Sequence, residues 1–361
     1  STPAQCRGRF YFETRTTIAM NLRHAILPLA LALSLPAVAD AARGFEVRDM
    51  AYLDRHSSPT LSPDGRVLVF AKRVVDKTTN KSSTSLWMRN LVTRDMRPPS
   101  RLTPEGWNVN SPAFSADGKT VYFMSAKSGS TQLYSMPLAG GEPTRLTDTA
   151  VDVDGYKLSP DGTQVALALA VFPECKADLD CTKKKLDEVE ALKTTGKVFD
   201  RMFIRHWDTW NDGRLNRVFA AKLGSDMVKS ATLLSGDIAG DIPSKPFGDL
   251  SDFAWSADGK QVAMSVRQAN REEPWSTNFD IWLVNADGSG ARNLTAKNPA
   301  WDAGPVFSAD GKTLYYRAMA RPGFEADRFA LMAMDLASGK TREIASKWDA
   351  SADGITLSAD G

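Results

Sequence analysis

The chain has 361 residues, of which 42% are hydrophobic and 24% charged, a composition typical of a soluble globular protein and not of a disordered one. Its 45 Lys and Arg residues balance 43 Asp and Glu residues, so the net charge of +2 gives no electrostatic argument for binding nucleic acid or a membrane surface. Partners therefore have to be inferred from particular sites.

The beginning of the chain has the pattern of an export signal. Residues 1–19 show no apolar period, and we expect them to be an upstream or artificial segment, with a structured N-terminal extension as the alternative. Residues 20–41 start at Met20 and contain a basic stretch, then an apolar run over 25–38 that is too short to span a bilayer, then small residues that suit a signal peptidase. We therefore expect a periplasmic or secreted protein.

If the protein is exported, its cysteines are expected to form disulfides, because disulfides persist in oxidising compartments. Cys6 lies in the segment expected to be lost, which leaves Cys175 and Cys181 as a pair. A local disulfide is the favoured interpretation, and two free thiols are the alternative. A metal site is disfavoured, because no nearby His or further Cys completes a tetrahedral ligand set.

A repeated Ser-Pro/Ala-Asp-Gly segment organises the rest of the chain. The first serines lie 53, 44, 97, 52 and 50 residues apart, so one interval holds a large insertion and the others fit a four-stranded propeller blade. Asp-Gly favours a tight reversal between two strands, and alternating strands follow each segment. The segments begin at Ser62, Ser115, Ser159, Ser256, Ser308 and Ser358.

This period predicts an all-β fold, a β-propeller of four-stranded antiparallel blades. We expect residues 42–361 to form about five complete blades and the start of a sixth, which makes the chain a truncated ring. A two-sheet sandwich is the alternative, and the uniform period argues against it.

The third blade carries the insertion, over about residues 173–216. It contains both cysteines and a helical pattern in which Leu186, Val189 and Leu192 fall near one face, with Thr182 as the expected cap and Gly196 as the expected end. Long loops on a rigid scaffold are often binding or gating elements, and a lid without a specific role is the alternative.

Two further segments carry a family resemblance. Residues 205–213 read Arg-His-Trp-Asp-Thr-Trp-Asn-Asp-Gly, and residues 275–282 read Trp-Ser-Thr-Asn-Phe-Asp-Ile-Trp. Together with the blades, they make the chain from about Phe45 onward resemble the propeller portion of exported serine peptidases of the prolyl oligopeptidase family, in the branch of acylaminoacyl peptidases and dipeptidyl peptidase V.

The resemblance implies a propeller that caps an α/β-hydrolase domain and admits short peptides to a Ser-Asp-His triad. The chain has no Gly-x-Ser-x-Gly motif, and only His56 and His206 follow the signal. We therefore expect no catalytic residue, metal or cofactor here, and we expect the hydrolase domain beyond Gly361. His206 as a general base is disfavoured, because no nucleophile accompanies it.

Candidate substrate-binding residues follow from the same resemblance. In the related dipeptidyl peptidase IV branch, two neighbouring Glu residues of the propeller bind the substrate ammonium, and Glu272-Glu273 is the only adjacent pair in this sequence. The pair and the insertion both connect second to third strands, so they are expected on one face. Solvated surface carboxylates are the alternative.

Three residues of the insertion are further candidates. Arg205 could hold a peptide carbonyl or carboxylate, Asp208 could orient Arg205 or bind the amine, and Trp210 lies beside them in the sequence. The alternative is an aromatic and ion-paired patch that packs the insertion on its blade.

Two functions remain in view. The first is the gating and positioning propeller of an exported serine exopeptidase, with short peptides and its own hydrolase domain as partners. The alternative is a non-enzymatic periplasmic propeller resembling TolB, which binds protein partners. That type normally has an α/β domain before its blades, whereas here the first Asp-Gly turn comes early. No cluster of His and carboxylates supports a lactonase or sugar site. Peptide specificity and homodimerisation stay open.

Overall fold

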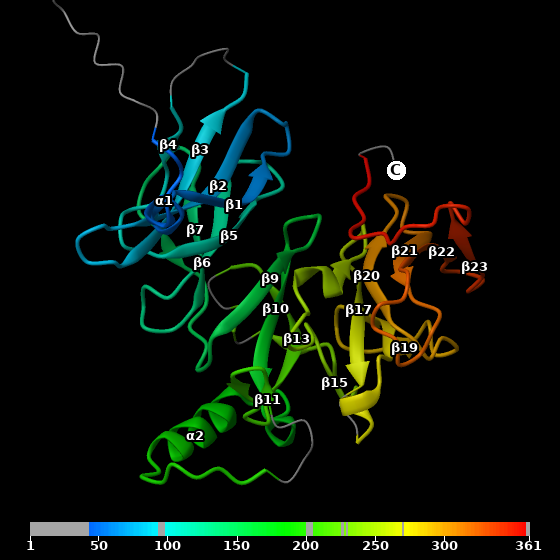
Figure 1. Cartoon of the computed structure of the whole chain (residues 1–361). Helices are drawn as coiled ribbons and strands as arrows, with labels where there is room; N and C mark the ends of the chain where they lie inside the picture. The colour runs from blue at the N-terminus through cyan, green and yellow to red at the C-terminus, as the bar shows by residue number, and fades with distance from the viewer. Residues whose placement is uncertain are drawn as a thin grey trace, which may run out of the picture. The chain divides into compact units, whose positions relative to one another are not determined.

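The computed structural model describes residues 43–92, 98–199, 205–224, 227–228, 230–268 and 271–358 (Figure 1). The expected extension and export signal lie outside the described residues, as does most of the sixth repeat segment. The chain divides into two compact units, Ser1–Met50 and Ala51–Gly361, and the short helix α1 (Val47–Tyr52) spans the boundary. All further elements belong to the second unit.

Five antiparallel sheets follow one another along the chain, and we call them blades 1 to 5. Blades 1 and 2 consist of β1 (Arg55–Leu61), β2 (Val67–Val75), β3 (Ser82–Asn90) and β4 (Ser100–Arg101), then β5 (Val109–Phe114), β6 (Thr120–Ser125), β7 (Gln132–Pro137) and β8 (Thr144–Arg145). Blade 3 consists of β9 (Val153–Leu158), β10 (Gln164–Val171), β13 (Leu215–Lys222) and β14 (Thr232–Leu233). Blades 4 and 5 consist of β15 (Gly240–Asp241), β16 (Phe253–Trp255), β17 (Gln261–Gln268), β18 (Phe279–Asn285) and β19 (Arg292–Asn293), then β20 (Asp302–Phe307), β21 (Thr313–Ala318), β22 (Ala330–Asp335) and β23 (Thr341–Ile344). The prediction of an all-β fold is confirmed, and four of these five blades have the predicted four strands, whereas blade 4 has five.

Each of the five repeat segments that the structure describes forms the same hydrogen-bonded turn between the first two strands of its blade. The Ser62 hydroxyl donates to the Asp64 carboxylate over 2.6 Å, and the N–H of Arg66 donates to the same carboxylate over 3.1 Å. Gly65 has a φ of 69°, in the left-handed region that favours glycine. The Ser-to-Asp hydrogen bond recurs in the other four described turns at 2.5–2.7 Å. These bonds lower the pKa of Asp64 and of its four counterparts.

The hydrophobic core lies between consecutive blades. Successive residues of a strand point to opposite faces, so Ala166 and Ala168 of β10 belong to the cluster shared with blade 4. Leu167 and Leu169 instead belong to the cluster that contains Leu133 of blade 2. Each fully buried leucine of this kind contributes about 1.5–3 kcal/mol. Sheets stacked in this way form the propeller.

The connection between β10 and β13 is the long insertion that the sequence predicted, and we call it the excursion. Its helix α2 (Leu179–Glu190) begins earlier than expected, because Asp178 is the N-cap and its carboxylate accepts from the N–H of Cys181 over 2.9 Å. The predicted cap at Thr182 is therefore wrong. The helix ends at Glu190, well before Gly196, so the predicted end is also wrong.

Thr182 has a packing role instead. Its side chain is fully buried, and its hydroxyl oxygen accepts from the N–H of Phe172 over 3.3 Å. Leu186 packs against the core of blades 2 and 3, whereas Val189 and Leu192 are each 61% exposed. The predicted apolar face of the helix thus stops after Leu186.

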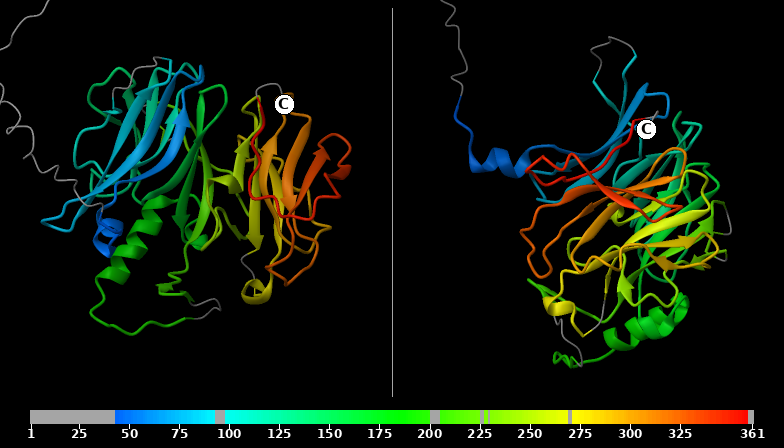
Figure 2. Two further views of the ribbon diagram at one scale, coloured as in Figure 1. Left: turned by 45° about the horizontal axis from the view of Figure 1, so that its top comes forward. Right: turned by 90° about the vertical axis from the view of Figure 1, so that its right-hand side faces the viewer.

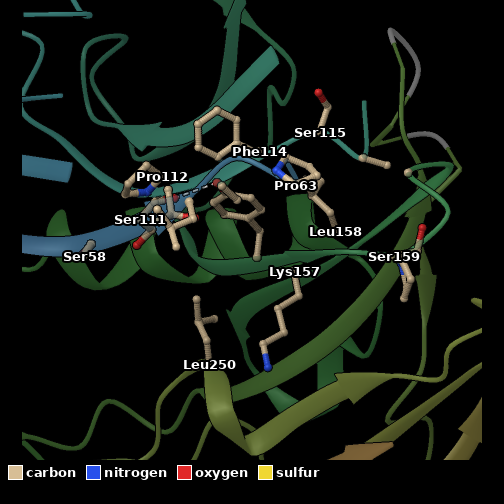
Figure 3. Close-up of a pocket in the computed structure, with 17 residues that line it drawn as sticks. Ser58, Pro63, Ser111, Pro112, Phe114, Ser115, Lys157, Leu158, Ser159 and Leu250 are labelled. Atoms are coloured by element: carbon tan, nitrogen blue, oxygen red, sulfur yellow. Dashed lines mark hydrogen bonds between the residues drawn. The ribbon is translucent and has the colours of Figure 1, made fainter. Parts of the chain in front are cut away.

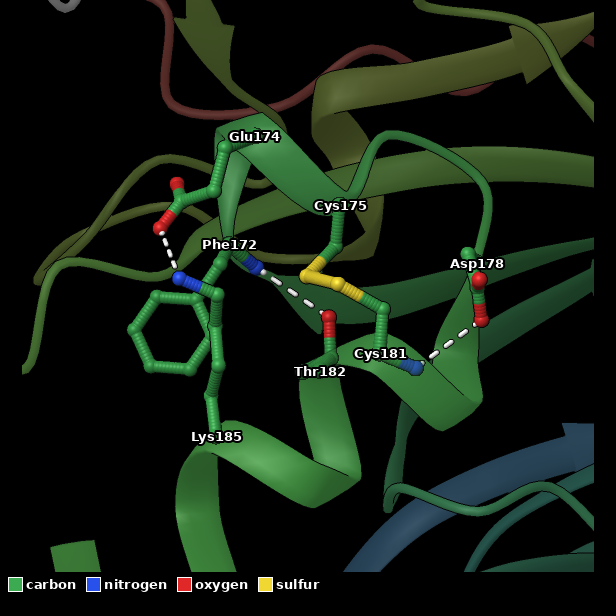
Figure 4. Close-up of a disulfide and its surroundings, with 7 residues drawn as sticks. All are labelled: Phe172, Glu174, Cys175, Asp178, Cys181, Thr182 and Lys185. Atoms are coloured by element: carbon green, nitrogen blue, oxygen red, sulfur yellow. Dashed lines mark hydrogen bonds and ion pairs between the residues drawn. A yellow bond between two sulfur atoms is a disulfide. The ribbon is translucent and has the colours of Figure 1, made fainter. Parts of the chain in front are cut away.

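A disulfide between Cys175 and Cys181 closes the base of the excursion (Figure 4). It joins the short 3-10 helix η1 (Pro173–Cys175) to the first turn of α2, with the two Cα atoms 5.6 Å apart. An ion pair of 2.7 Å between Lys185 and Glu174 adds a second link between the same two elements.

Blade 4 contains a strand that the sequence did not indicate. β15 pairs with the end of β17, with Asp241 opposite Arg267. The Asp241 carboxylate is buried and accepts from the N–H groups of Asn216 and Lys245, each over 2.6 Å. The loop after β15 is thereby attached to the point where the excursion re-enters blade 3. No described helix is both long enough and apolar enough to cross a membrane.

Candidate functional site

The second-to-third-strand connections emerge at the end of the blades opposite the Ser-x-Asp-Gly turns. In blades 3 and 4 these connections are the excursion and the loop that holds the 3-10 helix η3 (Glu273–Trp275). Figures 1 and 2 show α2, in green, and η3, in yellow below β17, at this common end. We call it the excursion face.

The residues 205–210 form a small hairpin on this face, with β11 (Arg205–His206) paired to β12 (Thr209–Trp210). The guanidinium of Arg205 lies 5.5 Å from the Trp210 ring centre, and the Phe199 ring stacks on Trp210 at 5.5 Å. Trp210 therefore packs parts of the excursion together, although it is 47% exposed. Asp208 is exposed in the hairpin turn.

The pair Glu272-Glu273 lies at the start of η3. Glu272 is exposed, and its backbone carbonyl accepts from the N–H groups of Trp275 and Ser276. Glu273 is half-buried, and burial raises the pKa of its carboxyl group, while the positive charge of Arg267 opposes the shift. Of the two carboxylates, Glu273 is thus the one held away from water.

A cavity of about 640 Å³ opens on the excursion face beside η3. Its walls come from the hairpin, the loop after β15, η3 and the loop between β21 and β22. Aromatic rings dominate them, together with one imidazole and one guanidinium. The lining includes His206, Phe247, Arg267, Trp275, Phe279, Trp301 and Phe324. We call it the aromatic cavity.

None of the five predicted binding residues lines this cavity. His206, the hairpin residue that does line it, follows Arg205 in the sequence, and Pro274, another lining residue, follows Glu273. The structure therefore brings the hairpin and η3 to one site. The side chains of Arg205, Asp208, Trp210 and Glu272 are exposed nearby.

Positive charge governs the electrostatics of the cavity wall. Arg267 donates to the carbonyl of Glu273 over 3.0 Å and to that of Lys245 over 3.4 Å, and its guanidinium lies 5.8 Å from the Phe279 ring centre. Burial lowers the pKa of His206, and the charges of Arg267 and Lys245 lower it further. His206 thus offers a neutral imidazole at neutral pH.

Exposed aromatic side chains form the rim. Trp207 is 72% exposed and meets the ring of Phe247 edge-on at 5.5 Å, which joins the hairpin to the loop after β15. Trp275 is 65% exposed, and Phe324 is 40% exposed beneath the guanidinium of Arg321 at 4.0 Å. Apolar surface of this extent usually marks a binding region.

A second cavity, of about 600 Å³, lies along the first strands of blades 1 to 3 (Figure 3). Its walls carry Ser and Pro side chains of β1, of β5 and of the turns that follow β1, β5 and β9, and the Tyr156 hydroxyl donates to the carbonyl of Ser111 over 2.7 Å. Lys157 extends from β9 toward blade 4 and donates to the carbonyl of Phe253 over 2.6 Å. Burial lowers the pKa of Lys157 to about 8. No predicted site residue lies here.

Sequence reasoning missed several residues of the aromatic cavity. Arg267, Trp301 and Phe324 all lie outside the segments with a motif. Arg267 lies near the end of β17, next to the loop that joins β17 to β18. A search for basic or aromatic residues beside second-to-third-strand loops could have identified it. In the described ranges, no three His, Cys, Asp or Glu side chains are placed to hold a metal ion.

Sequence comparison relates this chain to peptidases. It is 31% identical over 310 residues to dipeptidyl-peptidase 5 of Porphyromonas gingivalis, across 85% of this chain and 44% of the relative. It is 28% identical over 355 residues to the probable dipeptidyl-peptidase 5 of Emericella nidulans, across 90% of this chain and 46% of the relative. The chain is thus a β-propeller that is similar in sequence to dipeptidyl-peptidases 5. It spans less than half of the length of either relative.

Residues 46–185 match the family model described as the TolB beta propeller domain. Among solved structures, acylaminoacyl peptidase of Pyrococcus horikoshii aligns with a TM-score of 0.57 at 12% identity, across 86% of this chain and 42% of that one. An acylaminoacyl peptidase in complex with Z-Gly-Gly-Phe-chloromethyl ketone aligns with a TM-score of 0.55 at 13% identity, across 82% and 40%. These similarities confirm the propeller fold. The sequence relatives bear out the resemblance to peptidases that the sequence showed.

Proposed function

We propose that this chain is the substrate-positioning and gating propeller of an exported serine exopeptidase that acts on short peptides. The observation that carries the proposal is the aromatic cavity, because both segments with the family resemblance contribute to it. His206 comes from one segment, and Trp275 and Phe279 come from the other. The dipeptidyl-peptidase 5 relatives support the same reaction class. The Ser-Asp-His triad would belong to a hydrolase domain outside this chain.

The cavity offers the chemistry that the N-terminal end of a peptide needs. Its aromatic walls can bury an apolar side chain, and Arg267 presents a guanidinium to a peptide carbonyl. We expect the carboxylate of Glu273, which is half-buried in η3 next to the lining residue Pro274, to form a charge-assisted hydrogen bond to the free ammonium group. Binding a cation there would stabilise the ionised carboxylate that burial disfavours.

The test compares Glu273→Gln with Glu188→Gln, an exposed glutamate of α2, in the full-length protein. A hydrogen bond to a charged group contributes about 1.5–3 kcal/mol, so Glu273→Gln should lower kcat/KM for dipeptidyl substrates with a free amine by about 10- to 100-fold. Glu188→Gln should leave it unchanged. Equal activity of both variants, or equal loss on N-acylated substrates, would contradict the role of Glu273.

The TolB-like alternative is favoured by one observation, the match of residues 46–185 to the TolB propeller family. Under that alternative the excursion face binds protein partners, and the full-length protein has no nucleophilic serine. Labelling with a fluorophosphonate probe, which reacts with activated serines, separates the two proposals. A labelled full-length protein supports the peptidase, and an unlabelled one supports the binding propeller.

We propose export to the periplasm or the medium on the basis of residues 20–41. N-terminal sequencing of the protein recovered from a periplasmic fraction should give a start near residue 42. Recovery from the cytoplasm with Met20 intact would contradict it.

A further inference from the structure

Two stacked aromatic rings from neighbouring blades form part of the cavity wall, and we call them the aromatic pair. Phe279 opens β18 of blade 4, and Trp301 directly precedes β20 of blade 5. Their ring centres are 4.4 Å apart with 16° between the planes, and their backbones form a parallel bridge. Trp301 also meets the ring of Phe329 edge-on at 5.5 Å.

The residue that follows each ring is a buried aspartate. Asp280 is 4% exposed and Asp302 is 1% exposed. Successive residues of extended chain point to opposite sides, so the two carboxyl groups lie behind the aromatic pair and not in the cavity. Asp302 joins the two blades, because its carbonyl accepts from the Ser265 hydroxyl of β17 over 2.6 Å.

Each carboxyl group has one oxygen without a hydrogen-bond partner in the described structure. Asp302 Oδ1 accepts from Asn298 Nδ2 over 2.9 Å, and Asp280 Oδ2 accepts from Asn293 Nδ2 over 2.7 Å. Asp302 Oδ2 and Asp280 Oδ1 are buried and unpartnered. An ionised carboxylate in such surroundings is costly, whereas a protonated one is not.

The propeller fold itself does not require acidic groups at this place. In blade 2 the position that corresponds to Asp280 is Gln132, because Gln132 precedes Leu133 as Asp280 precedes Ile281. Both the nitrogen and the oxygen of the Gln132 side-chain amide are hydrogen-bonded. In both blades the next N–H donates to a buried threonine hydroxyl, that of Thr147 or Thr295. Blade 4 has thus placed a carboxyl group where blade 2 keeps a neutral, satisfied amide.

We propose that Asp302, beside Asp280, is a proton-controlled switch of the aromatic cavity. Protonated Asp302 holds the start of β20 against blade 4 and keeps the aromatic pair stacked. Ionised Asp302 draws water between the two blades and loosens Trp301. The switch is a property of the cavity wall and does not depend on what the cavity binds.

The groups around Asp302 favour its protonated form. Burial is the main cause that raises the pKa of Asp302 to about 7; the side chains of Asn298 and Thr295 oppose this rise, and the negative charge of Asp280 contributes to it. Tyr316 of β21 faces the same group, and burial and Asp302 raise its pKa. The adjacent cations, Arg267 and Arg317, lie over the rings of Phe279 and Phe329 at 5.8 and 5.0 Å.

The test uses ¹⁹F NMR of the full-length protein labelled with 5-fluorotryptophan. Substitution Trp301→Phe assigns the Trp301 signal among those of the nine tryptophans of this chain. In the wild type the Trp301 signal should titrate with a midpoint near pH 7. Asp302→Asn should abolish the titration, and Asp280→Asn should move its midpoint to lower pH, because it removes a neighbouring negative charge. Asp349→Asn, at an exposed site, is the matched control.

A Trp301 signal that stays constant across neutral pH would overturn the switch. A titration that persists unchanged in Asp302→Asn would overturn it as well. If Asp302→Asn does not fold, the Asp280→Asn variant decides, because an unshifted midpoint there contradicts the coupling of the two carboxyl groups.

Discussion

Removing the disulfide at the base of the excursion should make the helix α2 open more often. We consider the double substitution Cys175→Ala and Cys181→Ser. The bridge closes a loop of seven residues, because the two cysteines are six positions apart. The chain-entropy relation gives about 2.4 kcal/mol for a loop of this size at 25 °C. The population of the open excursion should therefore rise about 50-fold.

Limited trypsin digestion measures this population directly. When the excursion closes faster than it is cut, the cleavage rate follows the fraction of open molecules. Cleavage after residues 183–185 of α2 should accelerate about 50-fold. Cleavage after the exposed Lys312, in a turn of blade 5, should not change. Wild-type protein treated with a reductant should match the variant.

The outcome that would refute this reasoning is a variant cut as slowly as the oxidised wild type. It would mean that the buried hydroxyl of Thr182 and the packing of Leu186 hold the helix without the bridge.

Three further predictions concern stability. Thr147→Val removes the acceptor for the buried N–H of Leu133, so the free energy of unfolding from guanidinium titration should fall by about 1–3 kcal/mol. Gly240→Ala places a Cβ against Val266 Cγ1 and a backbone carbonyl, so it should lower the midpoint of thermal unfolding, and an unchanged midpoint would contradict the packing of β15. Burial raises the pKa of Asp252 to about 7, so its contribution to stability is present at low pH and is lost as pH rises from about 4 to about 7. Asp252→Asn should flatten this decline in chemical denaturation measured across that range.

The blades could be predicted because their signal is local and repeated. Ser62, Asp64 and Gly65 form their turn from neighbouring atoms alone, so four residues suffice to specify it. The helix boundaries were less predictable. Asp178 and Thr182 are both residue types that cap helices. Asp178 is the cap here, because the hydroxyl oxygen of Thr182 accepts a hydrogen bond from the N–H of Phe172, which precedes η1.

The candidate site was only partly predictable for a related reason. The hairpin and η3 could be assigned to one face from strand direction, because antiparallel connections alternate between the two ends of a blade. The lining of the cavity could not be assigned in this way. Phe247, Trp301 and Phe324 come from three loops that meet only after blades 3, 4 and 5 have packed, and no local pattern marks them. Charged and polar candidates such as Asp208 stood out in the sequence, but they do not line the cavity.

The construction of the aromatic cavity makes it sensitive to how the blades pack. The Asp241 carboxylate ties the loop after β15 to Asn216 of blade 3. The buried hydroxyl oxygen of Thr277, just after η3, accepts from the N–H of Gly323 in blade 5 over 2.9 Å. Sites held by rigid elements keep their geometry only as long as those elements keep theirs. A small displacement of blade 5 against blade 4 would therefore move the Phe324 loop and Trp301 together, so the protonation of Asp302 between these blades can change the whole cavity and not one side chain.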